Sequence, residues 1–165
     1  MQHTLQISRK IDYGLRAMIY LASVPGGSIV PFREVARAMD IPQDFLAKIL
    51  KTLVDTGIVR SVRGARGGYG LGRPASEISF LDVIEAVEGP VQLNICLTDK
   101  GKEECGLSFS CTMHSVWKEG QERLLEVYRN AKLDRLAMKA DSAPLQSLRT
   151  HPEDSRSLPK ASPPA

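Results

Sequence analysis

The sequence predicts a mostly α-helical protein: a winged helix-turn-helix domain with a two-stranded wing, followed by a long C-terminal dimerisation helix. Three observations predict this class. Two short helical patterns are joined by about three residues, a basic glycine-rich hairpin follows them, and apolar residues recur at coiled-coil spacing after residue 113. The 165 residues are 42% hydrophobic but only 5% aromatic, which indicates a core of aliphatic side chains on helices.

The first expected helix covers residues 8–24. Ile11, Leu15 and Met18 recur at helical spacing, and Ser8 is a suitable N-cap. A second, short helix is expected to begin at Pro31.

Pro42 is expected to open a third helix, which Gly57 ends. We expect Phe45 and the leucines and isoleucines after it to face the core. The outward positions of this helix are Gln43, Asp44, Ala47, Lys48 and Lys51. Two short helices joined by about three residues match the helix-turn-helix unit, whose second helix enters the major groove. The alternative is an ordinary helical hairpin with solvated lysines, which has the same helix spacing.

The next segment favours the DNA-binding interpretation. Residues 58–63 alternate like a strand, residues 64–68 form a flexible tip, and residues 69–71 return as a second strand. This hairpin carries Arg60, Arg63 and Arg66, as a wing that contacts phosphates or the minor groove would. The chain has neither of the two glycine motifs that bind nucleotide phosphates. Residues 1–74 hold 11 Lys and Arg against 5 Asp and Glu, whereas the remainder holds 11 against 14, so a polyanion would bind the front half.

Ser79 and Asp82 resemble a capping box that opens a helix ending at Gly89. Farther on, apolar or small residues repeat at alternating spacings of four and three, as in a coiled-coil seam. They are Met113, Trp117, Gly120, Leu124, Val127 and Ala131. One such helix cannot bury its own stripe, so we expect a homodimer, with packing onto the helix's own domain as the alternative.

The cysteines of the chain are Cys96, Cys105 and Cys111, and His114 follows the last of them by three residues. Thiolates and imidazole bind both zinc and iron–sulfur clusters, and the paired C-x-x-C knuckles typical of zinc are missing. Three interpretations stay open: a metal or cluster site, a thiol redox site, or three thiols without a function.

We therefore expect four parts: a DNA-binding domain over 1–90, a cysteine-containing loop over 91–112, a dimerisation helix over 113–140, and a disordered tail over 141–165. The sequence has no run of roughly 20 apolar residues and no apolar N-terminal signal. We expect a cytoplasmic protein without a membrane partner, in a compartment where thiols stay reduced.

Several stretches resemble the winged-helix regulator family that includes the iron–sulfur cluster regulator IscR, the nitric-oxide sensor NsrR and the iron regulator RirA. They are residues 11–17 (IDYGLRA), 45–50 (FLAKIL), 62–71 (VRGARGGYGL) and 72–75 (GRPA). Together with the three cysteines, the resemblance covers roughly residues 5 to 135.

The resemblance implies a homodimer on a dyad-symmetric site in double-stranded DNA, with an iron–sulfur cluster held by Cys96, Cys105 and Cys111. In IscR-like members a histidine at the place of His114 completes a 2Fe–2S cluster. In some NsrR-like members an aspartate at the place of Asp12, donated by the other subunit, completes a 4Fe–4S cluster. Both residues are present here, and the first gap between cysteines is longer than in IscR.

We expect a transcriptional repressor that senses iron, redox state or nitric oxide through such a cluster. Lys48, Lys51 and the three wing arginines would contact phosphates or bases, and Gln43, Asp44 and Ala47 would read sequence. The alternatives are a cluster-free regulator switched by thiol oxidation and a scaffold protein that only dimerises. Catalysis is not expected, because no nucleophile–base arrangement is present.

Overall fold

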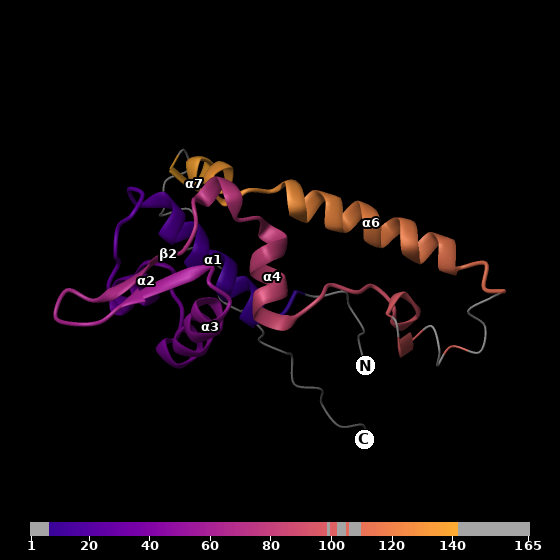
Figure 1. Cartoon of the computed structure of the whole chain (residues 1–165), viewed down its shortest axis with the longest axis horizontal. Helices are drawn as coiled ribbons and strands as arrows, with labels where there is room; N and C mark the ends of the chain where they lie inside the picture. Colours follow the sequence, from indigo (N-terminus) through magenta and orange to yellow (C-terminus); the bar gives the residue numbers. More distant parts are fainter. Residues whose placement is uncertain (1–6, 99, 102–104, 106–109, 142–165) are drawn as a thin grey trace, which may run out of the picture.

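The computed structural model describes residues 7–98, 100–101, 105 and 110–141 (Figure 1). Much of the expected cysteine loop between residues 99 and 109, and the expected tail from residue 142, lie outside the described residues. The predicted class is confirmed, because the described chain is mostly helical with one two-stranded antiparallel sheet. The elements are α1 (Arg9–Ser23), α2 (Phe32–Ala38), α3 (Gln43–Asp55), β1 (Val59–Val62), β2 (Gly68–Leu71), η1 (Ala75–Glu77), α4 (Phe80–Glu88), η2 (Ile95–Leu97), α6 (His114–Asn130) and α7 (Leu133–Asp141).

Helix α1 is the central element of the core and packs against α2, α3, α4 and α7. Ser8 caps it as predicted, since its hydroxyl accepts a hydrogen bond from the Ile11 N–H at 3.2 Å. Gly14 allows α1 and α4 to approach closely, because a Cβ on Gly14 would lie 3.2 Å from Val87 Cγ2. The core is aliphatic, as the low aromatic content indicated.

The helix-turn-helix unit forms over α2 and α3, and each of its prolines lies one position earlier than expected, at the N-cap. Leu46, Ile49 and the leucines after them are buried, which confirms the predicted inner face. The prediction for Phe45 was wrong: this side chain is 51% exposed. It lies in the first turn of α3, where its ring and that of Tyr13 meet edge-on with 5.9 Å between centroids.

The capping box at the start of α4 is present in full. The Ser79 hydroxyl accepts from the Asp82 N–H at 3.0 Å, while the Asp82 carboxylate accepts from the Ser79 N–H at 2.7 Å. Partial burial by itself raises the pKa of Asp82, but the hydrogen bonds from Ser79, with the charges of Arg73 and Lys132, hold that pKa below its usual value. This contribution to stability is therefore complete above the usual pKa of 3.8 and is lost as the pH falls through the folded-state value.

The single helix predicted over residues 113–140 is in fact two helices, and this expectation was wrong. Helix α6 extends outward from the core with its C-terminal end nearest to it, and α7 follows at that end and packs on α1 (Figure 1). The break occurs because the chain between them pairs with the start of α4. The Phe80 N–H donates to the Ala131 carbonyl at 2.8 Å, and the Leu133 N–H donates to the Ile78 carbonyl at 3.0 Å. No helix among the described residues is long and apolar enough to cross a membrane.

We predict that Ser79→Ala lowers the free energy of unfolding by about 1 kcal/mol, because Ser79 is 2% exposed and its hydroxyl caps α4. Urea unfolding followed by circular dichroism measures the change. Ser76→Ala, at an exposed position of η1, is the matched control and should leave the unfolding midpoint in place. Equal midpoints for the two variants would contradict the assigned cap.

Candidate nucleic-acid interface and cysteine segment

Helix α3 presents a polar face on the side away from the core. Its buried residues fix the orientation of the helix, and the five side chains predicted to face outward are all exposed. They are Gln43, Asp44, Ala47, Lys48 and Lys51. Exposed Phe45 lies among them and was missed by the sequence analysis, because its type and spacing indicated a core residue. A face of this composition, with cations and hydrogen-bonding groups, suits contact with phosphates and base edges.

The wing is fixed to the helix-turn-helix unit by a backbone bridge. The Val30 and Tyr69 backbones exchange hydrogen bonds of 2.8 and 2.9 Å. Gly68 permits this approach, because a Cβ there would lie 2.2 Å from the Val30 carbonyl oxygen. The sequence held one signal for this close contact, a glycine directly before the strand expected at residues 69–71, but no pattern indicated that its partner is Val30.

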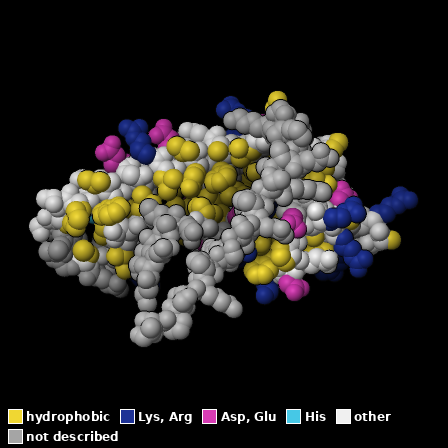
Figure 2. Space-filling model, turned by 180° about the vertical axis from the view of Figure 1, so that it is seen from behind, with side chains coloured by type: hydrophobic (Ala, Val, Ile, Leu, Met, Phe, Trp, Pro, Cys, Tyr) yellow, Lys and Arg dark blue, Asp and Glu magenta, His cyan; other side chains and the backbone are white. Residues whose placement is uncertain are grey.

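Two of the three predicted wing arginines lie beyond the paired strands, at the tip. Arg63 and Arg66 are exposed in the turn between β1 and β2. Gly64 in this turn has φ of +114°, a conformation that favours glycine. Figure 2 shows Lys and Arg side chains gathered at the end of the molecule that carries the helix-turn-helix and wing. The tip therefore presents two long, exposed cationic side chains that can reach a polyanion.

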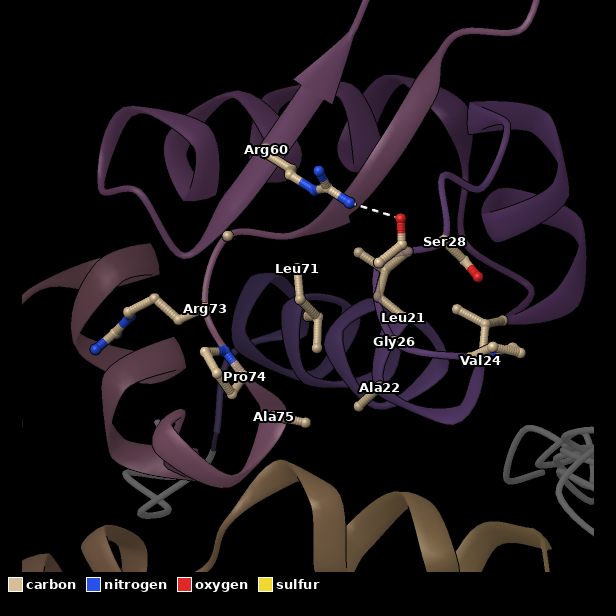
Figure 3. A pocket seen from close by; sticks show the side chains of 13 residues that line it. Leu21, Ala22, Val24, Gly26, Ser28, Arg60, Leu71, Arg73, Pro74 and Ala75 are labelled. Atoms are coloured by element: carbon tan, nitrogen blue, oxygen red, sulfur yellow. Dashed lines mark hydrogen bonds between the residues drawn. The ribbon is translucent and has the colours of Figure 1, made fainter.

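Arg60 is placed differently from the other two. Its guanidinium donates a 2.6 Å hydrogen bond to the Gly27 carbonyl, across the base of the wing (Figure 3). The bond spans a hollow of about 580 Å³ between the C-terminal end of α1 and the wing strands, lined in part by Leu21, Leu71 and Arg73. Arg60 thus braces the wing against the loop after α1, a role that no sequence pattern indicated.

The cysteine segment, residues 91–112, begins after α4, and its short helix η2 packs against α6 (Figure 1). Cys96 lies in η2 and is 8% exposed, whereas Cys105 and Cys111 are half-buried, and all three are free thiols. Among the described residues, the structure does not gather three or more His, Cys, Asp or Glu side chains into a metal-binding group. The donor set itself, three unpaired thiols and an imidazole, fits the chemistry of an iron–sulfur cluster.

The two candidate fourth ligands lie in different surroundings. His114 is the first residue of α6, and its N–H donates to the Cys111 carbonyl at 3.2 Å, so it is adjacent to the last cysteine. Asp12 lies in the first turn of α1 and pairs with Arg16 at 2.8 Å. In a single chain the backbone therefore places only His114 next to a cysteine, and Asp12 is engaged by its own helix.

Comparison with known proteins agrees with this architecture. Residues 7–139 match the Rrf2 family, described as iron-dependent transcriptional regulators, and the chain belongs to this family. An HTH-type transcriptional regulator of Mycobacterium tuberculosis is 42% identical over 87 residues, which are 53% of this chain and 54% of that protein. The chain thus spans about half the length of the curated relatives it matches.

Solved structures cover more of the chain. CymR of B. subtilis, the global cysteine regulator, has a TM-score of 0.67 at 29% identity, over 82% of this chain and 98% of that one. IscR of T. potens also has a TM-score of 0.67, at 28% identity, over 85% of this chain and 92% of that one. The resemblance to the family of IscR is confirmed.

We predict that iodoacetamide labels Cys96 roughly tenfold more slowly than Cys105 and Cys111 in the reduced, metal-free protein, since only Cys96 is buried. A factor of ten corresponds to about 1.4 kcal/mol of local opening. Mass spectrometry of timed samples measures the rates, and labelling in urea is the control in which the three rates should converge. Equal rates in the folded protein would show that η2 does not protect the thiol.

Proposed function

We propose that the chain is a dimeric, DNA-binding transcriptional repressor that senses iron, redox state or nitric oxide through an iron–sulfur cluster. The observation that carries the DNA-binding part is the pairing of an exposed polar face on α3 with exposed arginines at a braced wing tip. The family match over residues 7–139 supports the same reading.

The proposed DNA contacts divide by chemistry. Lys48, Lys51, Arg63 and Arg66 are exposed cations and would bind phosphates or, at the wing tip, the minor groove. Arg60 would contribute through the brace to Gly27, with its remaining N–H groups available to a phosphate.

Base reading would fall to the exposed start of α3. Gln43 and Asp44 lie in its first turn and Ala47 follows one turn later. Amide, carboxylate and methyl groups at these positions match the hydrogen-bonding and apolar features of base edges in the major groove.

The dimer would form along α6. No residue of this helix is buried. Several of its apolar side chains are exposed, together with that of its N-cap Met113: Met113, Val116, Trp117 and Val127 are between 38% and 68% exposed. Figure 2 shows hydrophobic side chains gathered over the half of the molecule that contains α6. Such a stripe on a projecting helix is covered most simply by the same stripe of a second copy, which would also place two α3 helices on a two-fold symmetric site.

The cluster would be held by Cys96, Cys105 and Cys111, with His114 or the Asp12 of a second subunit as the fourth ligand. The donor chemistry and the family's description as iron-dependent support this assignment. When bound, the cluster would be the group that is oxidised or lost, and either event would change the bonding of its cysteine ligands. Residues 91–98 contact α6, so a change at the cysteines would reach the helix proposed to join the two subunits.

A cluster-free regulator switched by thiol oxidation is the second candidate. It is favoured by the accessibility of Cys105 and Cys111, which are free and half-buried in the same segment. In that case oxidant-induced disulfides in the iron-free protein would change its affinity for DNA.

We predict that Arg66→Ala weakens binding to every DNA sequence and reduces the slope of log affinity against log salt by about one, because one phosphate contact is lost. Lys51→Ala should act alike. Fluorescence anisotropy at several salt concentrations measures the slope, with Arg135→Ala as control, since Arg135 is an exposed arginine on α7. An unchanged slope removes the residue from the interface.

We predict that protein purified and reconstituted without oxygen carries a cluster that His114→Ala or Asp12→Ala disturbs. A ratio near two irons and two sulfides per chain, sensitive to the histidine change, assigns His114 and a 2Fe–2S cluster. A ratio near four, sensitive to the aspartate change, assigns Asp12. Absorption spectra with iron and sulfide analysis give the answer. Colourless protein after reconstitution contradicts the cluster and favours the thiol switch.

A further inference from the structure

One side chain of α6 reaches the backbone of the cysteine segment. The Leu93 N–H donates a 3.0 Å hydrogen bond to Gln121 Oε1, between residues 28 positions apart in the chain. The Leu93 side chain also lies over Gly120, since a Cβ on Gly120 would be 3.6 Å from Leu93 Cδ1. Two neighbouring positions of α6 therefore contact Leu93, one through a hydrogen bond and one through van der Waals packing.

The contact between Leu93 and Gln121 lies between Cys96 and α6, the proposed dimer helix. Leu93 is three residues before Cys96, the buried cysteine, and η2 itself packs against α6. Within the part of the chain that the structure describes, no other hydrogen bond joins residues 91–98 to α6. Gln121 is half-buried on a helix most of whose side chains are exposed, which fits a side chain committed to a contact.

We propose that Gln121 is the positioning residue that couples the cysteine segment to α6, so that a change at Cys96 alters DNA binding through Leu93 and Gln121. The inference rests on the proposed function and specifies its regulation. Leu93 offers an N–H that only an acceptor can satisfy. Glutamine and glutamate have such an acceptor at the same distance from the backbone, whereas leucine does not. Glutamate should therefore preserve the coupling and leucine should remove it.

The contact is tested first without DNA. In Gln121→Leu, hydrogen exchange at the Leu93 amide should become about 2- to 13-fold faster, the range expected for one net hydrogen bond. Gln121→Glu should exchange like the wild type. Glu119→Leu is the matched control, because Glu119 is exposed and lies two positions earlier, on the opposite side of the helix. Unchanged Leu93 exchange in Gln121→Leu would overturn the contact.

The coupling is tested by the ratio of DNA affinities between two states of the cysteines, metal-loaded and metal-free, in the full chain. Gln121→Leu should move this ratio toward one by a factor of roughly 2 to 30. Gln121→Glu and Glu119→Leu should keep the wild-type ratio. A wild-type ratio in Gln121→Leu, with its Leu93 amide demonstrably released, would overturn the proposal.

The outcomes separate this inference from the proposed function. If the wild-type protein shows no difference in DNA affinity between the two states, the sensing function fails before Gln121 is tested. If the wild type shows the difference and Gln121→Leu retains its iron content and absorption spectrum but loses the difference, the positioning role is supported independently of cluster binding.

Discussion

The backbone pairing between Ile78–Phe80 and Ala131–Leu133 determines how the two halves of this protein are related. It ends α6, begins α7 and buries Leu133 completely, so that α7 can return to α1. The same stretch contains Ser79, which caps α4. Without this pairing, residues 113–141 would have no reason to break, and one long helix would leave the apolar side of α7 in solvent.

The pairing also gives α6 a fixed end. At its C-terminal end the helix is joined to the start of α4, and the Phe80 and Tyr128 rings lie 5.1 Å apart between centroids. Toward the middle it is joined to the cysteine segment through Gln121. Beyond that point the helix projects with its apolar side chains accessible. A helix held at one end and contacted near its middle can transmit a displacement, because an α-helix bends far less readily than the loops on either side of it.

Local chemistry explains which features could be predicted from sequence. The caps at Ser8 and Ser79, the turn at Gly57 and the glycine-rich wing depend on residues within a few positions of one another, and each is found as expected. The break after α6 could not be predicted, because alanine and lysine at 131 and 132 favour a helix and only a distant strand-like partner overrides them. Phe45 was misjudged because the core ends before it. The hydrogen bond from Arg60 to the Gly27 carbonyl could not be predicted either, because the two residues are 33 positions apart.

The fourth ligand of the proposed cysteine site could not be predicted from the sequence, for a different reason. Spacing identifies which residues carry soft donors, but the structure of one chain leaves Asp12 paired with Arg16 on α1 and His114 beside Cys111. For Asp12 to bind iron, its carboxylate would have to exchange an ion pair at 2.8 Å for a ligand bond supplied across a subunit boundary. His114 requires no such exchange, since the backbone already brings it to the last cysteine. The Asp12 and Arg16 side chains are 45% and 36% exposed, however, so losing their ion pair would cost less than about 1 kcal/mol. Local energetics therefore do not separate the two proposed ligands, and the choice depends on which of them a second subunit brings to the cysteines.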